Sequence, residues 1–193
     1  MAGEKLRLFT AVRVPFEQLE WLDRAVGELK GLSGARWTNV ESRHVTLNFL
    51  GWVESELLAD VVGAVDEAAR RHAPARVSLA GLGAFPGERR ARVLWAGLDD
   101  PAGLLPALAA DLGERLRTTG YEPEDRPYTA HLTLARFKTP RPVELPGLPE
   151  APEAFSVDRV TLFRSRLSAA GARYEVMHEA YLSASAADAE RSQ

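Results

Sequence analysis

The chain has 193 residues, of which 46% are hydrophobic and 26% charged, and this suits one globular domain or two small lobes that share a core. It contains no cysteine, which excludes disulfides and thiolate zinc sites. Its net charge of −3 gives no general attraction to nucleic acid, so a phosphate ligand has to be held by a local group of basic residues.

The sequence also lacks membrane and export signals. No apolar run approaches the roughly 18 residues that a membrane span needs. Residues 1–15 do not follow the basic, apolar and small-residue order of a signal peptide. Together with the absence of cysteine, this predicts a cytoplasmic protein with no membrane partner.

The hydrophobic pattern predicts about seven strands and three helices. In chain order the predicted elements are a strand at 5–14, a helix at 15–31, a strand at 43–51, a helix at 55–72, strands at 76–85 and 92–98, a helix at 104–120, and strands at 129–137, 155–164 and 173–183. The turn PGERRA makes the two middle strands a hairpin, and the Pro-rich residues 138–154 form a loop. Because strands and helices are interspersed, the predicted fold class is α+β.

Individual residues mark the expected helix ends. Pro15 opens the first helix and Ser55 is the expected N-cap of the second. Pro106 has to lie in the first turn of the third helix, because farther in it would remove a helical hydrogen bond. Residues 184–193 are expected to form a disordered tail, which leaves 1–183 as a single bilobal domain.

One short pattern occurs twice in a chain with only four histidines. RHVTLNFLG at 43–51 and AHLTLARF at 130–137 both contain His, an apolar residue, Thr and Leu. Side chains alternate between the two faces of a strand. This alternation predicts one face with His44, Thr46 and Asn48, the opposite face with Val45, Leu47 and Phe49, and a polar face on the other strand with His131, Thr133 and Ala135. If the two polar faces meet in a cleft, two imidazoles and two hydroxyls converge.

These groups suit the opening of a 2′,3′-cyclic phosphate by water, with no metal or other cofactor. A neutral imidazole can take a proton from water, and an imidazolium can give one to the departing ribose oxygen. Histidine holds both states near neutral pH because its ordinary pKa is about 6.5. Threonine hydroxyls can donate hydrogen bonds to the phosphate oxygens on which charge accumulates. A single His-x-Thr is more often a structural pair, so the repetition is what favours catalysis.

The chain resembles the RNA 2′,3′-cyclic phosphodiesterases of the two-histidine (2H) phosphoesterase superfamily, also called 2′-5′ RNA ligases. The resemblance covers roughly residues 6–183 and is carried by HVTLNFLG, HLTLARF, RLFTAV, LGAFPGERRARVLWAGL and VTLFRSRLSAAGARYEV. It implies a bilobal fold in which two antiparallel sheets, with helices outside, face each other across a cleft with a pseudo-two-fold axis. We expect a monomer, because the two lobes already bury each other.

The resemblance also assigns roles. It makes His44 and His131 the catalytic pair and Thr46 and Thr133 the phosphate donors. The product in this family is a 2′-phosphate, so the bond to O3′ breaks and the general acid faces O3′. The resemblance assigns His44 as this acid and His131 as the base. The sequence alone does not order the two histidines. Arg43 points away from the first histidine by strand alternation and is expected to be an ordinary surface charge.

Further residues are candidates for substrate binding. Arg126 lies in the loop that enters the second motif. By strand alternation Arg136 points to the face opposite His131, so it reaches the cleft only if a twist or bulge reverses that face. The alternative for both is a surface salt bridge. Phe9 and Tyr128 are candidates for stacking on a terminal base, and Trp37 is as well suited to the core as to stacking.

The remaining charged candidates have plainer interpretations. The basic turn GERRAR, 87–92, can steer RNA or simply keep the turn soluble. His72 ends a helix and His178 lies in a late strand, so both are expected to be structural or exposed.

Alternative functions use the same residues. The leading function is metal-independent hydrolysis of RNA or nucleotide 2′,3′-cyclic phosphate ends. One alternative is 2′-5′ ligation of RNA, which reverses the same chemistry, and another is a non-catalytic module that binds RNA or nucleotides. A metallohydrolase is disfavoured, because His-x-Thr is not the helical His-x-x-x-His spacing of metal ligands.

Overall fold

The structure is a computed structural model that describes residues 4–123, 127–168 and 171–183. Within these ranges the chain forms three α-helices and nine strands. The elements in chain order are β1 (Lys5–Arg13), α1 (Phe16–Ala25), η1 (Gly27–Gly31), β2 (Ala35–Trp37), η2 (Val40–Ser42), β3 (His44–Glu54), η3 (Ser55–Leu57), α2 (Leu58–Ala69), β4 (Ala75–Phe85), η4 (Glu88–Arg90), β5 (Ala91–Asp99), α3 (Leu104–Leu116), η5 (Arg117–Thr119), β6 (His131–Arg141), β7 (Phe155–Val157), β8 (Arg159–Ser168) and β9 (Gly171–Tyr181), where η denotes a 3-10 turn.

Most predicted elements are present. The expected strand at 155–164 is two strands, β7 and β8, and the three-residue β2 has no counterpart in the prediction. Strand β6 runs to Arg141 and so takes in the first residues of the expected loop at 138–154. The predicted tail, residues 184–193, lies outside the described residues.

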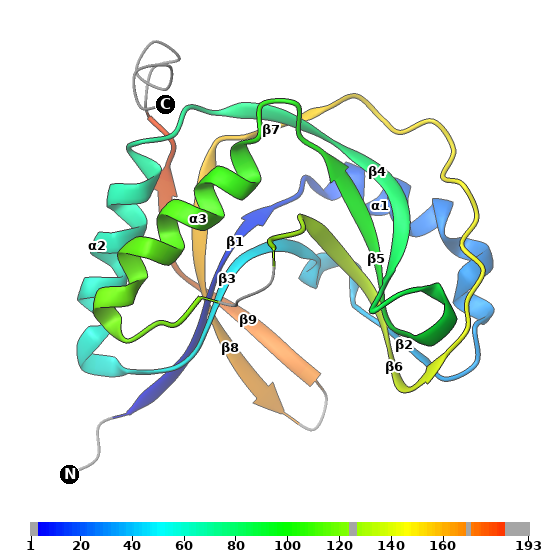
Figure 1. The fold of residues 1–193 in the computed structure, drawn as a ribbon, viewed down its shortest axis with the longest axis horizontal. Coiled ribbons are helices and arrows are strands. Elements are labelled where there is room, and N and C mark those ends of the chain that lie inside the picture. The colour runs from blue at the N-terminus through cyan, green and yellow to red at the C-terminus, as the bar shows by residue number, and fades with distance from the viewer. Residues whose placement is uncertain (1–3, 124–126, 169–170, 184–193) are drawn as a thin grey trace.

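The strands form a curled antiparallel arrangement in the order β7-β4-β5-β6-β3-β1-β8-β9, and β2 pairs with β6. Its two half-sheets, β7-β4-β5-β6 and β3-β1-β8-β9, are joined where Val45 of β3 pairs with Leu132 of β6. Figure 1 shows the strands of one half turning away from those of the other. The predicted α+β fold of two antiparallel sheets is confirmed, with the two sheets joined edge to edge at this point.

Helices lie against both half-sheets. Helices α2 and α3 pack together and against β3, β8 and β9, on one side of that half (Figure 1). The segment between β1 and β3 crosses to the other half, because Thr38 N donates to Leu134 O at 2.8 Å and Gln18 Nε2 donates to Glu153 O at 3.0 Å. The segment between β1 and β3 therefore packs against the half-sheet that contains β6, although β1 and β3 belong to the other half-sheet. This crossing links the two halves.

The apolar stripes of the helices pack against the apolar faces of the strands to form the core. In α2, Val61, Val65 and Ala69 follow one another at helical spacing and are at most 1% exposed. Leu58 and Val62 of the same helix are half-buried and pack against this stripe. One part of the core thus fills the space between α2, α3 and the β3-β1-β8-β9 half, and the rest extends into the other half through residues such as Val77 and Phe137.

The expected helix ends are partly confirmed. Pro106 is the third residue of α3 and so lies in its first turn, as predicted. The carboxylate of Asp100 accepts hydrogen bonds from the first two backbone N–H groups of this helix. Ser55 as an N-cap is wrong, because Ser55–Leu57 forms a 3-10 turn and α2 begins only at Leu58.

Candidate active site

The two His-x-Thr motifs are neighbours in space. Each begins a strand, β3 or β6, and these strands run antiparallel with Val45 opposite Leu132. Both of these apolar residues are fully buried, so the histidine and threonine on either side of each point to the other face. The pairing brings His44, Thr46, His131 and Thr133 to one region of the sheet, as the sequence predicts.

Both imidazoles are held in the same way. His44 Nδ1 lies 2.8 Å from the Ser42 carbonyl oxygen, and His131 Nδ1 lies 2.8 Å from the Thr129 carbonyl oxygen. A carbonyl only accepts hydrogen bonds, so Nδ1 carries the proton in each ring. Proton exchange with a ligand is thereby assigned to Nε2 in both histidines.

An aromatic cluster surrounds His44. The ring of Phe9 stacks on the imidazole with 4.8 Å between centroids, and Tyr174 meets it edge-on at 5.1 Å. Phe163 stacks on Phe9 at 5.1 Å. Phe9 is only 2% exposed, so its role as a base-stacking residue stays a prediction that requires a neighbouring ring to move. In this structure Phe9 orients the imidazole.

His131 has a smaller aromatic frame from the other half-sheet. Phe85 meets its ring edge-on at 5.0 Å, and Trp95 lies at 6.2 Å. Trp95 fits here because Gly83 has no side chain: a Cβ at Gly83 would lie 2.1 Å from the indole. The sequence analysis missed Tyr174, Phe85 and Trp95, because only strand pairing brings them to the histidines.

The surroundings of His44 favour its neutral form. Burial, helped by the nearby positive charges of His131 and Arg136, lowers its pKa to about 4 despite the raising effect of the hydrogen bond to the Ser42 carbonyl. His44 is therefore neutral at pH 7 in the ligand-free protein. The contribution of Arg136 also shows that its guanidinium is close enough to His44 to act on its titration.

A β-bulge turns Arg136 towards the motifs. Thr133 and Ala135 of β6 pair with two consecutive residues of β5, so Leu134 is the extra residue of a bulge. Leu134 and Ala135 are both buried, and Arg136 comes round to the face of His131. The sequence predicts that Arg136 reaches the cleft only if a twist or bulge is present in this strand. The structure contains such a bulge.

Strand β3 has the same irregularity. Thr46 and Asn48 pair with consecutive residues of β1, so Leu47 is the extra residue. Leu47 and Asn48 are both buried, and Phe49 is 43% exposed. The expectations that Asn48 shares the polar face and that Phe49 shares the apolar face are therefore wrong, because the bulge reverses the alternation. Phe49 thus occupies the position in β3 that Arg136 occupies in β6, five residues after the histidine.

Asn48 instead connects three elements inside the molecule. Its side-chain Nδ2 donates to the Ala109 carbonyl of α3 at 3.0 Å. Its backbone N–H donates to Thr10 Oγ1 of β1 at 3.1 Å, and that hydroxyl donates to Asn48 Oδ1 at 3.3 Å. These bonds fix the bulged part of β3 directly behind the first motif.

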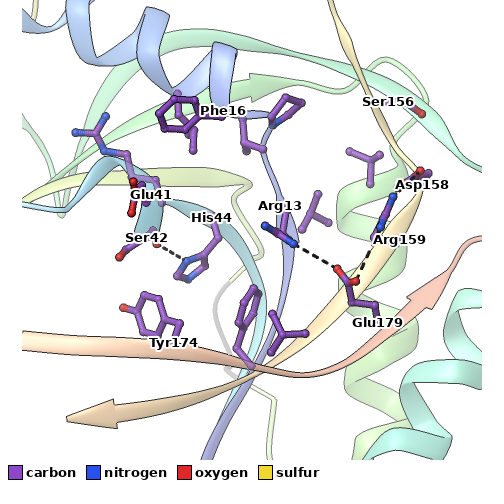
Figure 2. A pocket seen from close by; sticks show the side chains of 18 residues that line it. Arg13, Phe16, Glu41, Ser42, His44, Ser156, Asp158, Arg159, Tyr174 and Glu179 are labelled. Atoms are coloured by element: carbon purple, nitrogen blue, oxygen red, sulfur yellow. Dashed lines mark hydrogen bonds and ion pairs between the residues drawn. The ribbon is translucent and has the colours of Figure 1, made fainter.

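Two cavities border the motifs. The larger, of about 660 Å³, has His44 in its wall (Figure 2). Its cations are largely neutralised, since Figure 2 shows Arg13 and Arg159 both directed to Glu179, at 3.6 and 3.9 Å. The smaller cavity, of about 250 Å³, is lined by Thr46, His131, Phe49, Phe85 and Tyr128, among others. His44 thus borders the larger cavity, and Thr46 and His131 border the smaller one.

The threonine hydroxyls are available to a ligand. Neither Thr46 Oγ1 nor Thr133 Oγ1 has a hydrogen-bond partner within the described residues. Their backbones are fixed, because Tyr128 Oη donates to Thr46 O at 3.1 Å and Thr38 Oγ1 donates to Thr133 O at 2.9 Å. Burial raises the pKa of Tyr128, so its hydroxyl stays protonated and keeps this hydrogen bond.

Comparison with known proteins decides the family. The model of the 2′-5′ RNA ligase superfamily matches residues 15–168. The chain belongs to this superfamily. A relative from Archaeoglobus fulgidus, named RNA 2′,3′-cyclic phosphodiesterase, is 36% identical over 137 residues, which are 71% of this chain and 76% of that protein. A Thermus thermophilus relative with the same name is 34% identical over 184 residues, 90% of this chain and 89% of that protein.

Solved structures of superfamily members share the fold. A crystal structure of a Thermus thermophilus protein has a TM-score of 0.81 and 32% identity, and covers 92% of this chain and 98% of its own. The crystal structure of E. coli LigT complexed with 3′-AMP has a TM-score of 0.83 and 25% identity, and covers 94% of this chain and 100% of its own. The predicted membership of the 2H phosphoesterases is therefore confirmed.

The sequence also predicts binding or structural roles for residues outside the two motifs. Arg126 lies outside the described residues, and Trp37 packs partly buried against the core, which favours its structural alternative. His72 Nε2 lies 3.2 Å from Asp111, and His178 Nε2 lies 2.6 Å from an aspartate of α2, as expected of structural histidines. The basic turn contains the exposed η4, and its steering role stays a prediction.

The expectation for Arg43 is wrong. Its side chain is 1% exposed and its Nη2 donates to Asp23 Oδ1 at 2.8 Å. Burial raises the pKa of Asp23, but hydrogen bonds from Lys30 and Arg43 outweigh it, so the pKa lies below its ordinary value. Arg43 points away from His44 as predicted, yet that face is covered by α1, which supplies the partner carboxylate, Asp23.

The described residues show neither the pattern of a metal site nor that of a membrane-spanning helix. Where the structure describes the chain, no group of three or more His, Asp or Glu side chains is placed to hold a metal ion. In the same residues no helix combines the length and apolar character needed to cross a membrane.

Proposed function

We propose that this protein hydrolyses the 2′,3′-cyclic phosphate ends of RNA or of nucleotides to 2′-phosphates, with His44 and His131 as general acid and base and without a metal ion. The observation that carries the proposal is the symmetric pair of His-x-Thr motifs, joined at Val45 and Leu132, in which both rings hold Nδ1–H on a carbonyl. The names of the curated relatives support the same reaction.

The reaction needs two proton transfers and one displacement at phosphorus. Water attacks phosphorus and gives a proton to the Nε2 of the neutral imidazole. The P–O3′ bond breaks, and O3′ takes a proton from the Nε2 of the imidazolium. The product is a 2′-phosphate with a free 3′-hydroxyl, and solvent then restores the two starting protonation states.

The other groups act on the phosphate oxygens. Thr46 and Thr133 donate hydrogen bonds to the non-bridging oxygens, whose charge grows in the transition state. Arg136, turned to this face by its bulge, adds a positive charge near them. The two phenylalanines Phe9 and Phe85 keep the imidazoles in orientation.

The order of acid and base stays a prediction. The family resemblance makes His44 the acid, whereas its lowered pKa makes it neutral at pH 7 in the ligand-free protein, which is the state of a base. A bound phosphate anion raises the pKa of His44, because it favours the imidazolium. The pH dependence of kcat/KM, which reports the free enzyme, decides between the two orders. A rising limb near pH 4 that His44→Ala removes assigns His44 as the base, and a falling limb there assigns it as the acid.

The test is hydrolysis of a nucleoside 2′,3′-cyclic phosphate in EDTA, with the product read by phosphorus NMR. We expect a 2′-phosphate from the wild type and a fall in kcat of about 10²–10⁴-fold in His44→Ala and in His131→Ala. His72→Ala is the matched control, since it removes a histidine of the same chain that pairs with Asp111. No turnover by a folded wild type would leave only nucleotide binding, and loss of turnover in EDTA would contradict a metal-free reaction.

Ligation is a second outcome of the same experiment. RNA fragments with a 2′,3′-cyclic phosphate and a 5′-hydroxyl are added, and a joined 2′-5′ product is sought by gel electrophoresis. We expect hydrolysis to exceed ligation, because water competes with the 5′-hydroxyl at the same phosphorus. We further infer that the protein acts as a monomer in the cytoplasm, and analytical ultracentrifugation tests the first part.

A further inference from the structure

Two exposed aromatic side chains and a half-buried arginine form a strip that leads away from the smaller cavity along β3. We call Arg7, Phe49 and Trp52 the Trp52 strip. Trp52 is 64% exposed and Phe49 is 43% exposed, although both lie within a strand and away from the chain ends. Large aromatic groups that are exposed on one sheet face are characteristic of binding surfaces.

The Trp52 strip lies on the face of its half-sheet opposite α2 and α3. Arg7 and Trp52 are direct partners in the β1–β3 pairing, and partners across a pair share a face. The adjacent partners Leu6 and Val53 are 4% and 7% exposed and point into the core under α2 and α3. The strip is thus on the concave side of the curl shown in Figure 1, the side that carries the motifs.

Arg7 gives the strip its charge. Its guanidinium carbon lies 4.5 Å from the centroid of the Phe49 ring, and its Nη1 donates to Ser165 Oγ at 2.9 Å. Among residues 4–123, 127–168 and 171–183, no carboxylate lies within ion-pair distance of Arg7, whereas Lys5 on the same strand pairs with Glu54 at 2.7 Å. Arg7 is therefore a positive charge that a phosphate group can approach, held in place by an aromatic ring and a hydroxyl.

The strip is continuous with the candidate active site. Phe49 lines the smaller cavity together with Thr46 and His131. Trp52 follows three residues later, about 10 Å along the strand at roughly 3.3 Å per residue. A molecule that occupies the motifs and extends along β3 meets first Phe49, then Arg7 and Trp52.

We propose that the Trp52 strip binds the single-stranded RNA that precedes the terminal cyclic phosphate, with bases stacked on Phe49 and Trp52 and a backbone phosphate on Arg7. This inference rests on the proposed function. A cyclic phosphate occupies the 3′ end of an RNA, so the rest of the strand leaves the site only on the 5′ side. Aromatic rings with an adjacent cation are how proteins hold single strands without reading their sequence. The protein then prefers an oligonucleotide to a mononucleotide, with little dependence on base identity.

The test compares kcat/KM for a nucleoside 2′,3′-cyclic phosphate with that for an oligonucleotide ending in the same group. In Trp52→Ala and Arg7→Gln we expect kcat/KM for the oligonucleotide to fall about five- to 100-fold, with the mononucleotide value unchanged. Tyr181→Ala is the matched control, because Tyr181 is 59% exposed and also lies under an arginine, Arg159 at 4.5 Å, while Tyr181 itself lines neither cavity. An equal fall on both substrates, or no fall on either, overturns the proposal.

A binding measurement separates this proposal from the proposed function. Quenching of tryptophan fluorescence by an oligonucleotide with a plain 3′-hydroxyl needs no turnover. We expect the oligonucleotide to quench the fluorescence of the wild type, and we expect this quenching to be lost in Trp52→Phe. Because this variant keeps a ring on which a base can stack, its kcat/KM for the oligonucleotide should stay within a few-fold of the wild-type value. If neither substrate is hydrolysed but the quenching is seen, the proposed function fails and the strip stands. A dimer that dissociates in Trp52→Ala while oligonucleotide binding is unchanged assigns the strip to a second copy instead.

Discussion

Val45 and Leu132 pair across the junction of the two half-sheets, and each lies between the histidine and the threonine of its motif. Both side chains are fully buried. The contact that joins the halves therefore also sets the positions of His44 and His131 relative to each other. Changes at this contact should act on stability and on catalysis together.

Leu132→Ala is the first prediction. Removing a fully buried leucine side chain should lower the free energy of unfolding by about 2–5 kcal/mol, and the cavity left behind should let the two motifs shift. We expect kcat to fall as well, at a temperature where the variant is folded. Leu105→Ala in α3 removes an equally buried leucine that is not part of the β3–β6 pairing and should destabilise without this effect on kcat. Urea titration and steady-state kinetics measure both quantities, and equal kcat values in the two variants would contradict the prediction.

The titration of His44 should respond to Arg136. Burial is the main cause of its low pKa of about 4, and the charge on Arg136 adds to it, so Arg136→Gln should raise the pKa of His44. Two-dimensional NMR of the imidazole nitrogens measures this directly. Arg89→Gln, which removes an arginine from the exposed η4, should leave the titration unchanged. An unchanged pKa in Arg136→Gln would place that guanidinium away from the cleft.

The same lowered pKa predicts a pH dependence of stability. His44 has a pKa of about 4 when folded, and an unfolded histidine has one of about 6.5. Between these values the unfolded chain binds more protons, so the contribution of His44 is fully present above pH 6.5 and is lost as the pH falls towards 4. We expect the free energy of unfolding to decline more steeply over this interval in the wild type than in His44→Gln. Parallel curves from denaturant titrations would show that His44 titrates normally.

Gly83 should be required for the frame around His131. A Cβ there would lie 2.1 Å from the Trp95 ring, so Gly83→Ala must displace the indole or the strand. We expect a loss of about 1–3 kcal/mol in stability, a change in tryptophan fluorescence and a lower kcat. Gly81→Ala on the same strand is the control, since a Cβ at that position has no atom within 4 Å. If both variants behave alike, Trp95 has room that the structure does not show.

Local patterns determined much of this protein. The alternation and helical spacing of apolar residues predicted the three α-helices and most strands, because burying one face requires that period. The repeated His-x-Thr predicted the catalytic candidates, since two residues on one face of a strand need only the regular geometry of that strand. His44, Thr46, His131 and Thr133 therefore needed no knowledge of the fold.

Only the tertiary structure decided where the neighbouring residues point. Asn48, Phe49 and Arg136 follow bulges that arise from pairing with other strands, and pairing is a property of two segments distant in the sequence. Tyr174 also reaches His44 through strand pairing, and Arg43 meets its partner Asp23 where α1 packs against it. The sequence by itself determined which groups can do the chemistry. The register between β1, β3, β5 and β6 decided which side chains surround them, because each extra residue in a strand reverses the faces that follow it until the next extra residue.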